Sequence, residues 1–342
     1  MLTLDFTNIR KTSTASNGYF DKWNKLFGGW GYYDEYLGEE GELLETLTTT
    51  GNRSLGSYFN SPSNINRKTK WIFGNSDKRI EINSLELEGT GKEETGYFIN
   101  NIFDLGNGQN YIEISLDFDS HETSNTTKSR LSTKGYSSTI LGGSGKDTLN
   151  ISAWENERSF VDTKSYISIN TKDGRDVIDF DTNFLLCAKI NSGSGSDKVD
   201  LDEANSSLVN AGAGNDNINL GRYIDYRFEK INIVKNIKDI VIGGSGVDRF
   251  IFNSGMWSSA YTLNGENDFC FIKDFEAKDK IILIEDSGEL RIDKQNGKVK
   301  LAASGAYPAQ LLSYTARVYS DGDLIAYISG SQPTIKDLTQ LP

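Results

Sequence analysis

Six short segments of this chain carry an acidic or amide side chain in the same local setting. In each segment a glycine stands two residues earlier, and no lysine or histidine occupies the acid position itself. Glycine tolerates positive φ and close backbone approach, so these segments suit tight turns whose carbonyl oxygens face a shared centre. Clustered oxygens of that kind favour a hard cation. The side chains are Asn110, Asp147, Asp176, Asp197, Asp216 and Asp248, and the glycines are Gly108, Gly145, Gly174, Gly195, Gly214 and Gly246.

Apolar residues frame each of these turns. One stands two residues after the acid position, one four residues after it, and one seven residues before it. The spacing of two is that of a strand with one buried face. One unit cannot bury that face alone, whereas stacked units can, so the frame predicts an all-β, right-handed parallel β-roll or β-helix solenoid. Ordinary β-turns rich in Gly, Asp and Asn are the alternative, but they leave the joint frame unexplained.

Stacking would bring the carbonyl and carboxylate oxygens of successive turns together. Ca²⁺ accepts about six to eight oxygens in irregular geometry, whereas Mg²⁺ prefers a strict octahedron and keeps its waters. We therefore expect several calcium ions, roughly two to five, as the cofactor. Besides the six side chains above, the candidate metal ligands lie in the turns: Gly142, Ser144, Gly145, Asp173, Gly174, Ser192, Ser194, Gly195, Ala211, Ala213, Gly214, Gly243, Ser245 and Gly246.

The repeated segments resemble the RTX (repeat-in-toxin, haemolysin-type calcium-binding) family, whose nonapeptide is Gly-Gly-x-Gly-x-Asp-x-apolar-x. Residues 142–150 and 243–251 match it fully. Residues 192–200 and 211–219 replace only the first glycine by a small residue, 171–179 keep only Gly174 and Asp176, and 105–113 have Asn110 for the acid. The resemblance implies calcium bound between turns of a parallel β-roll, usually in exported bacterial proteins.

The spacing of the motifs differs from that of the family. Successive acid positions lie 37, 29, 21, 19 and 32 residues apart, and no two motifs are nine apart. We therefore expect one glycine turn per coil and a single calcium row, with the best sites between Asp176, Asp197 and Asp216. Two weaker rungs are expected around Gly74 and around Gly265–Asp268, where the earlier glycine is missing and calcium is not predicted.

The chain divides into three parts in this interpretation. Residues 1–100 form an aromatic-rich N-terminal cap, either a plug over the open solenoid or a sugar-stacking surface, with eight aromatic residues between Tyr19 and Tyr36. Residues 101–285 form the calcium-binding β-roll. Residues 286–342 alternate as strands and are expected to be a C-terminal β cap and export segment. The stretch from Asp274 to Leu283 resembles the D-F-x-x-x-D-K-I-x-L segment that closes the β-roll of serralysin-type proteases.

The net charge and the absence of certain segments limit the possible partners and location of the protein. The formal net charge of −12 disfavours nucleic acid and anionic membrane surfaces. No apolar run is long enough to span a membrane, and the N-terminus lacks the pattern of a secretory signal. The family resemblance instead implies export by a type I secretion machinery, so we expect a secreted or cell-surface protein, with a cytoplasmic protein as the alternative. Cys187 and Cys270 stand in apolar strand contexts and are interpreted as core residues.

No catalytic site is evident from the sequence. The single histidine, His121, cannot supply an HExxH metalloprotease pair, no serine lies in a G-x-S-x-G motif, and no acid pair stands apart from the turn acids. We therefore expect a calcium-stabilised binding or structural module. Its candidate partner is a carbohydrate or another cell-surface ligand. The alternatives are an extracellular enzyme acting on a polysaccharide and the calcium module of a larger enzyme system.

Overall fold

The fold was analysed in a computed structural model of the chain. The structure describes residues 2–5, 69–72, 75, 78–84, 102–118, 137–155, 166–182, 187–201, 206–220, 238–253, 261, 267–284 and 289–341. The aromatic cluster of residues 19–36 and His121 lie outside these ranges. Within them the regular elements are β-strands, apart from one 3₁₀ turn, η3 (Ile335–Asp337).

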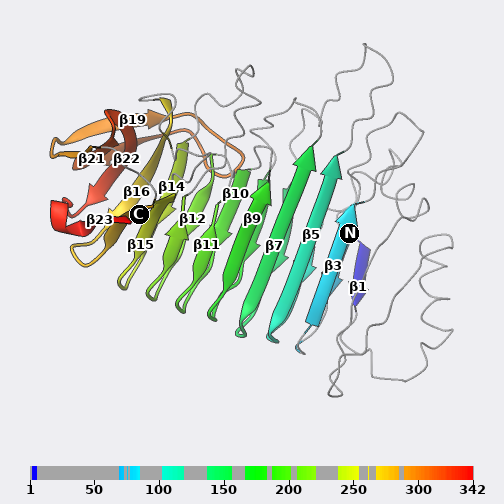
Figure 1. Ribbon diagram of the computed structural model, residues 1–342. Coiled ribbons are helices and arrows are strands. Elements are labelled where there is room, and N and C mark those ends of the chain that lie inside the picture. The colour runs from blue at the N-terminus through cyan, green and yellow to red at the C-terminus, as the bar shows by residue number, and fades with distance from the viewer. Residues whose placement is uncertain are drawn as a thin grey trace, which may run out of the picture.

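Two large sheets account for most of the described residues (Figure 1). In spatial order, the 12-stranded sheet, sheet 1, contains β1 (Leu2–Asp5), β2 (Thr69–Ile72), β4 (Ile102–Asp104), β6 (Ser137–Leu141), β8 (Tyr166–Asn170), β10 (Cys187–Asn191), β12 (Leu208–Asn210), β14 (Lys238–Ile242), β16 (Phe269–Phe275), β22 (Asp323–Gly330), β21 (Ala316–Ser320) and β18 (Leu290–Asp293). The 9-stranded sheet, sheet 2, contains β3 (Lys78–Ser84), β5 (Asn110–Phe118), β7 (Asp147–Glu155), β9 (Val177–Thr182), β11 (Lys198–Asp200), β13 (Asn217–Asn219), β15 (Arg249–Asn253), β17 (Lys280–Ile284) and β23 (Leu338–Leu341).

From β2 to β17 the chain alternates between the two sheets. Each strand of sheet 1 leads through a short turn into a strand of sheet 2, and the chain then returns to sheet 1 one position further along. Neighbouring strands in this part are parallel throughout, as between β10 and β12 or between β11 and β13. This topology confirms the all-β parallel solenoid, with one glycine turn per coil as the spacing predicts.

The interior of the coil is filled by the apolar frame seen in the sequence. Each of the six motifs contributes three apolar side chains, and all of these side chains are at most 3% exposed. They align in register because equivalent strands pair without slippage; Ile178, for example, faces Leu149 on one side and Val199 on the other. Burying a side chain of this size contributes roughly 1.5–3 kcal/mol, so each coil is stable only between neighbours that cover it.

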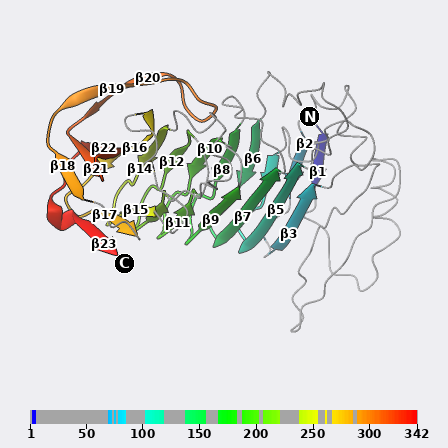
Figure 2. The same ribbon diagram turned by 45° about the horizontal axis from the view of Figure 1, so that its top comes forward.

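The C-terminal segment departs from the parallel pattern. Strands β22 and β23 continue the two sheets, whereas β18 and β21 pair antiparallel at the far edge of sheet 1. The hairpin of β19 (Gly297–Leu301) and β20 (Gln310–Tyr314) lies over the outer face of sheet 1 (Figure 2). A second apolar cluster fills the space between them, and it includes Cys187, whereas Cys270 belongs to the core inside the coil. Both cysteines are buried and neither forms a disulfide, consistent with their expected role as core residues.

One of the two weaker rungs lies elsewhere than expected. The strands that flank Gly74 in sequence, β2 and β3, do extend the two sheets by one rung. The residues after Asp268 instead form β16, which belongs to sheet 1 and precedes a turn rather than following one. The register of β15 with β17 pairs Arg249 with Lys280, so the residue equivalent to Asp248 is Asp279. The expectation failed because the turn at 274–279 contains no glycine.

Candidate metal-binding turns

Each of the seven turns from β4 to β17 contains six residues, and we number them 1 to 6 so that the acid, or Asn110 in the first turn, is position 6. Because the strands on both sides stay in register, equivalent turn positions of successive coils lie above one another. The aligned turns are 105–110, 142–147, 171–176, 192–197, 211–216, 243–248 and 274–279. The spacing differences between motifs therefore arise outside the turns, in the lengths of the strands and of the segments that lead from a strand of sheet 2 to the next strand of sheet 1.

The turns stack through their own backbone hydrogen bonds. At position 3, Ser194 N–H donates to the carbonyl of Lys172 at 2.6 Å, and Ala213 N–H donates to that of Gly193 at 2.8 Å. This close approach requires glycine at position 4: Gly195 has φ +136°, and a Cβ there would lie 1.4 Å from the Gly174 carbonyl oxygen. The alternating glycines therefore serve close packing of one turn upon the next.

The position-6 aspartates form a continuous ladder along the stack. From Asp147 to Asp248, the backbone N–H at position 6 donates to the Oδ1 of the equivalent aspartate in the following coil, whereas the N–H of Asn110 donates to the Lys146 carbonyl. Asp176 N–H, for example, reaches Asp197 Oδ1 at 2.9 Å, and Asp197 N–H reaches Asp216 Oδ1 at 2.8 Å. The same bond links Asp147 to Asp176 at 2.8 Å, Asp216 to Asp248 at 3.0 Å and Asp248 to Asp279 at 3.0 Å. We call these residues the aspartate ladder.

Five carboxylates of the ladder keep one oxygen without a partner. The Oδ2 atoms are buried and accept no hydrogen bond, although each of these side chains is at most 1% exposed. The five residues are Asp147, Asp176, Asp197, Asp216 and Asp248. A buried acceptor without a partner costs about 1–3 kcal/mol, and more when it is charged. A row of five such oxygens is unusual for a purely structural ladder, and each could bind a cation or carry a proton.

The pKa values of the ladder carboxylates are raised because these groups are buried. Burial raises the pKa of Asp176 to about 7 and of Asp216 to about 7, against a usual 3.8, and neighbouring ladder carboxylates raise both further. Burial likewise raises the pKa of Asp147 and of Asp248 to about 6, and that of Asp197 is also raised. Hydrogen bonds from the backbone oppose these shifts without cancelling them. Negative charge on the ladder is therefore costly unless a cation is bound.

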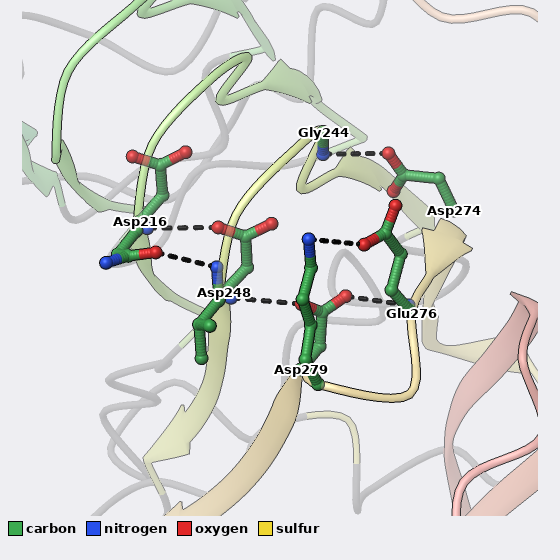
Figure 3. Close-up of polar contacts among 9 residues, drawn as sticks. Asp216, Gly244, Asp248, Asp274, Glu276 and Asp279 are labelled. Atoms are coloured by element: carbon green, nitrogen blue, oxygen red, sulfur yellow. Dashed lines mark hydrogen bonds and ion pairs between the residues drawn. The ribbon is translucent and has the colours of Figure 1, made fainter.

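The residues at the two ends of the ladder differ from the five aspartates between them in their hydrogen bonds. At the N-terminal end the neutral amide of Asn110 donates to Asp147 Oδ1 at 2.8 Å and to the Gly108 carbonyl at 2.8 Å. At the other end Asp279 uses both oxygens, accepting from Asp248 N–H and, at 2.7 Å, from Glu276 N–H (Figure 3). Five aspartates with a free oxygen therefore lie between Asn110, whose own Oδ1 is also buried without a partner, and Asp279, whose two oxygens are both hydrogen-bonded.

The last turn also carries a second acid, at position 1, where the other turns have none. Asp274, at position 1, accepts from the N–H of Gly243 at 2.9 Å through one oxygen, and from the N–H of Gly244 at 2.7 Å through the other. Figure 3 shows the bond to Gly244. In the other coils the N–H at position 1, equivalent to that of Gly243, pairs with a backbone carbonyl, as Ala211 N–H does with Ile242. Sequence reasoning missed Asp274 and Asp279 as members of the turn stack. The signal was present in the length of the segment and in its position-6 acid.

The remaining predicted ligands divide by turn position. Residues at position 1 are buried beside the ladder, and a Cβ at Gly142 would lie 1.9 Å from Asp147 Oδ2, so the free oxygens face this position. Residues at position 3 (Ser144, Asp173, Ser194, Ala213 and Ser245) have exposed side chains, and those of Ser194 and Asp173 bond to each other at 2.5 Å. Position 4 is occupied by the stacking glycines Gly145, Gly174, Gly195, Gly214 and Gly246. Position 1 is occupied by Gly142, Thr171, Ser192, Ala211 and Gly243.

The chemistry of a metal site here would be carried largely by main-chain oxygens. Within the described ranges, no three His, Cys, Asp or Glu side chains come together as a metal-binding group. A cation in the stack would therefore combine ladder Oδ2 atoms with backbone carbonyls of the turns, a donor set that suits Ca²⁺.

Sequence comparison adds no family to this geometry. No family model matches the chain, and no curated protein matches it.

Proposed function

We propose that this chain is an RTX-like calcium-binding protein whose solenoid is stabilised by calcium along the aspartate ladder. The observation that carries the proposal is the set of five buried Oδ2 atoms without partners. Asp147, Asp176, Asp197, Asp216 and Asp248 would supply the charge, and the backbone carbonyls of their turns would supply the remaining oxygens. The bound ion would neutralise the ladder and lock successive turns together.

Calcium is favoured over other occupants of these turns. Zinc prefers His and Cys ligands, which the ladder does not contain. Magnesium requires a regular octahedron that the irregular turns do not favour. Because metal binding to the native state adds directly to the free energy of folding, the solenoid would be weakly stable where calcium is scarce and stable where it is abundant.

The setting proposed for this protein is outside the cell, where calcium is plentiful. Support comes from the resemblance of its turns to those of exported RTX proteins, so export by a type I secretion machinery is part of the proposal. The described residues contain no helix long and apolar enough to cross a membrane. We propose a right-handed coil, the hand that parallel crossovers nearly always adopt, with the terminal segments as its caps. Its role would be that of a binding or structural module at a cell surface or in a matrix.

The test is thermal unfolding of the full chain followed by circular dichroism in Ca²⁺, in Mg²⁺ and in EDTA. Calcium should raise the melting temperature and the β-content, EDTA should reverse both effects, and an equal concentration of Mg²⁺ should have little effect. Calorimetric titration with Ca²⁺ counts the ions on the same samples. An identical melting curve in calcium and in EDTA, with no heat of binding, would refute the proposal.

A further inference from the structure

The β19–β20 hairpin is held firmly against sheet 1. Its inner side chains, among them Leu301 and Leu312, pack into the second apolar cluster. The loop between its strands is tied down as well: Ser304 Oγ donates to the Ser206 carbonyl at 2.9 Å, and the Tyr307 hydroxyl donates to the Lys238 carbonyl. These contacts fix which face of the hairpin is turned away from the sheet (Figure 2).

The face turned away is basic. Lys298 and Lys300 are exposed on β19, and their cross-strand partners on β20, Ser313 and Leu311, are exposed on the same face. We call these four residues the lysine face. Neither lysine forms an ion pair within the part of the chain that the structure describes, and the exposed Lys294, which lies just before β19, forms none there either.

The positive charge of the lysine face is opposite in sign to the net charge of the whole protein. The chain has 48 acidic and 36 basic residues. Between residues 290 and 317, however, the basic residues are Arg291, Lys294, Lys298, Lys300 and Arg317, and the only acid is Asp293. That acid is already paired with Arg317. The lysine face is therefore a local positive surface on an acidic protein, and a polyanion would be attracted there rather than to the rest of the chain.

We propose that the lysine face binds a linear polycarboxylate, such as an acidic polysaccharide. Two lysines on alternate residues of one strand stand about 7 Å apart, which presents a short row of point charges to an extended chain. Leu311, 61% exposed, adds an apolar contact beside them. This inference goes beyond calcium binding, because no residue of the aspartate ladder takes part in it.

The other classes of polyanion fit the lysine face less well. Single-stranded nucleic acid is bound on aromatic platforms, and no aromatic side chain belongs to this face; Tyr314 packs with the inner cluster. Attachment to an anionic membrane through basic residues uses clusters of about four to eight Lys or Arg, more than the lysine face offers. A carboxylated sugar chain needs neither bases nor bilayer insertion.

The experiment uses the full chain and hyaluronan, a linear polycarboxylate, with dextran as the neutral counterpart. The double variant Lys298→Glu/Lys300→Glu is compared with Lys189→Glu/Lys273→Glu, which changes net charge equally at exposed sites on sheet 1. We expect hyaluronan binding that weakens with added salt, a loss of about tenfold or more in the hairpin variant, and a smaller loss in the control. Dextran should not bind. Matching circular dichroism of both variants shows that the fold is intact.

Three results would overturn the proposal: no hyaluronan binding by the unmodified chain, equal losses in the two variants, or binding to single-stranded DNA or anionic vesicles without binding to hyaluronan. Calorimetry with Ca²⁺ on the same variants separates this proposal from the previous one. Loss of hyaluronan binding in the hairpin variant with intact calcium binding would show that the hairpin acts independently of the ladder. Absence of calcium binding in the unmodified chain would refute the calcium proposal and leave the hairpin proposal untouched.

Discussion

Replacing Asp216 by Asn should have opposite effects in calcium and in EDTA. The amide oxygen can still accept the bond from Asp197 N–H, which is 2.8 Å long in the native ladder. What changes is the second atom: the free carboxylate oxygen becomes an NH₂ group, and the negative charge disappears. In calcium the variant loses a charged ligand, so it should melt at a lower temperature and bind the ion more weakly.

In EDTA the same substitution removes a buried charge. The pKa of Asp216 is raised to about 7 from a usual 3.8, so ionising it above pH 7 costs up to about 4 kcal/mol of stability. The unpaired amide NH₂ reduces this gain by about 1–3 kcal/mol. We therefore expect the variant to be as stable as the unmodified protein in EDTA at pH 8, or slightly more stable. The assay is urea unfolding of both proteins in the two conditions.

Asp279→Asn is the matched control for this comparison. Both oxygens of Asp279 accept backbone N–H groups, those of Asp248 and Glu276, so an amide there would set its NH₂ against another donor. This variant should lose stability with and without calcium. A similar loss for Asp216→Asn in both conditions would show that the free oxygen of Asp216 has no cation to bind and would refute the reasoning.

Two further predictions follow from the same stack. In EDTA, ladder carboxylates with folded pKa values of about 6 to 7 hold protons that the unfolded chain has released above about pH 4, so the free energy of unfolding should fall as pH rises through this window and then level off; pH-dependent urea unfolding that rises over the same range would contradict it. Gly195→Ala should be strongly destabilising, because its Cβ would lie 1.4 Å from a backbone oxygen, whereas Gly322→Ala, where φ is also positive (+88°) but nothing lies within 4 Å, should cost only about 1 kcal/mol in thermal unfolding. Equal costs at the two sites would mean that close packing of the turns is not what requires glycine at 195.

The repeated frame made much of this fold predictable from sequence. Apolar residues at fixed offsets from Asp176 or Asp197 belong to strands in register, so the parallel coil and the stacked turns could be derived before any coordinates. The direction of the ladder could not, because whether Asp197 Oδ1 bonds to the turn before it or after it depends on backbone orientation. Asp274 and Asp279 were missed for a different reason: their turn, residues 274–279, contains no glycine, so the motif that marks the other turns is absent there.

The constant six-residue turn has a consequence for how such a chain tolerates change. Coils from 19 to 37 residues long fit the same stack, since the turn keeps six residues and the additional length lies in the strands and in the segments that lead back to sheet 1. A difference of 18 residues in coil length therefore leaves the register of the turns unaltered. A foreign peptide grafted into one of these segments, between β11 and β12 for instance, should be displayed without disturbing either neighbour, which makes this solenoid a scaffold whose two sides can evolve independently.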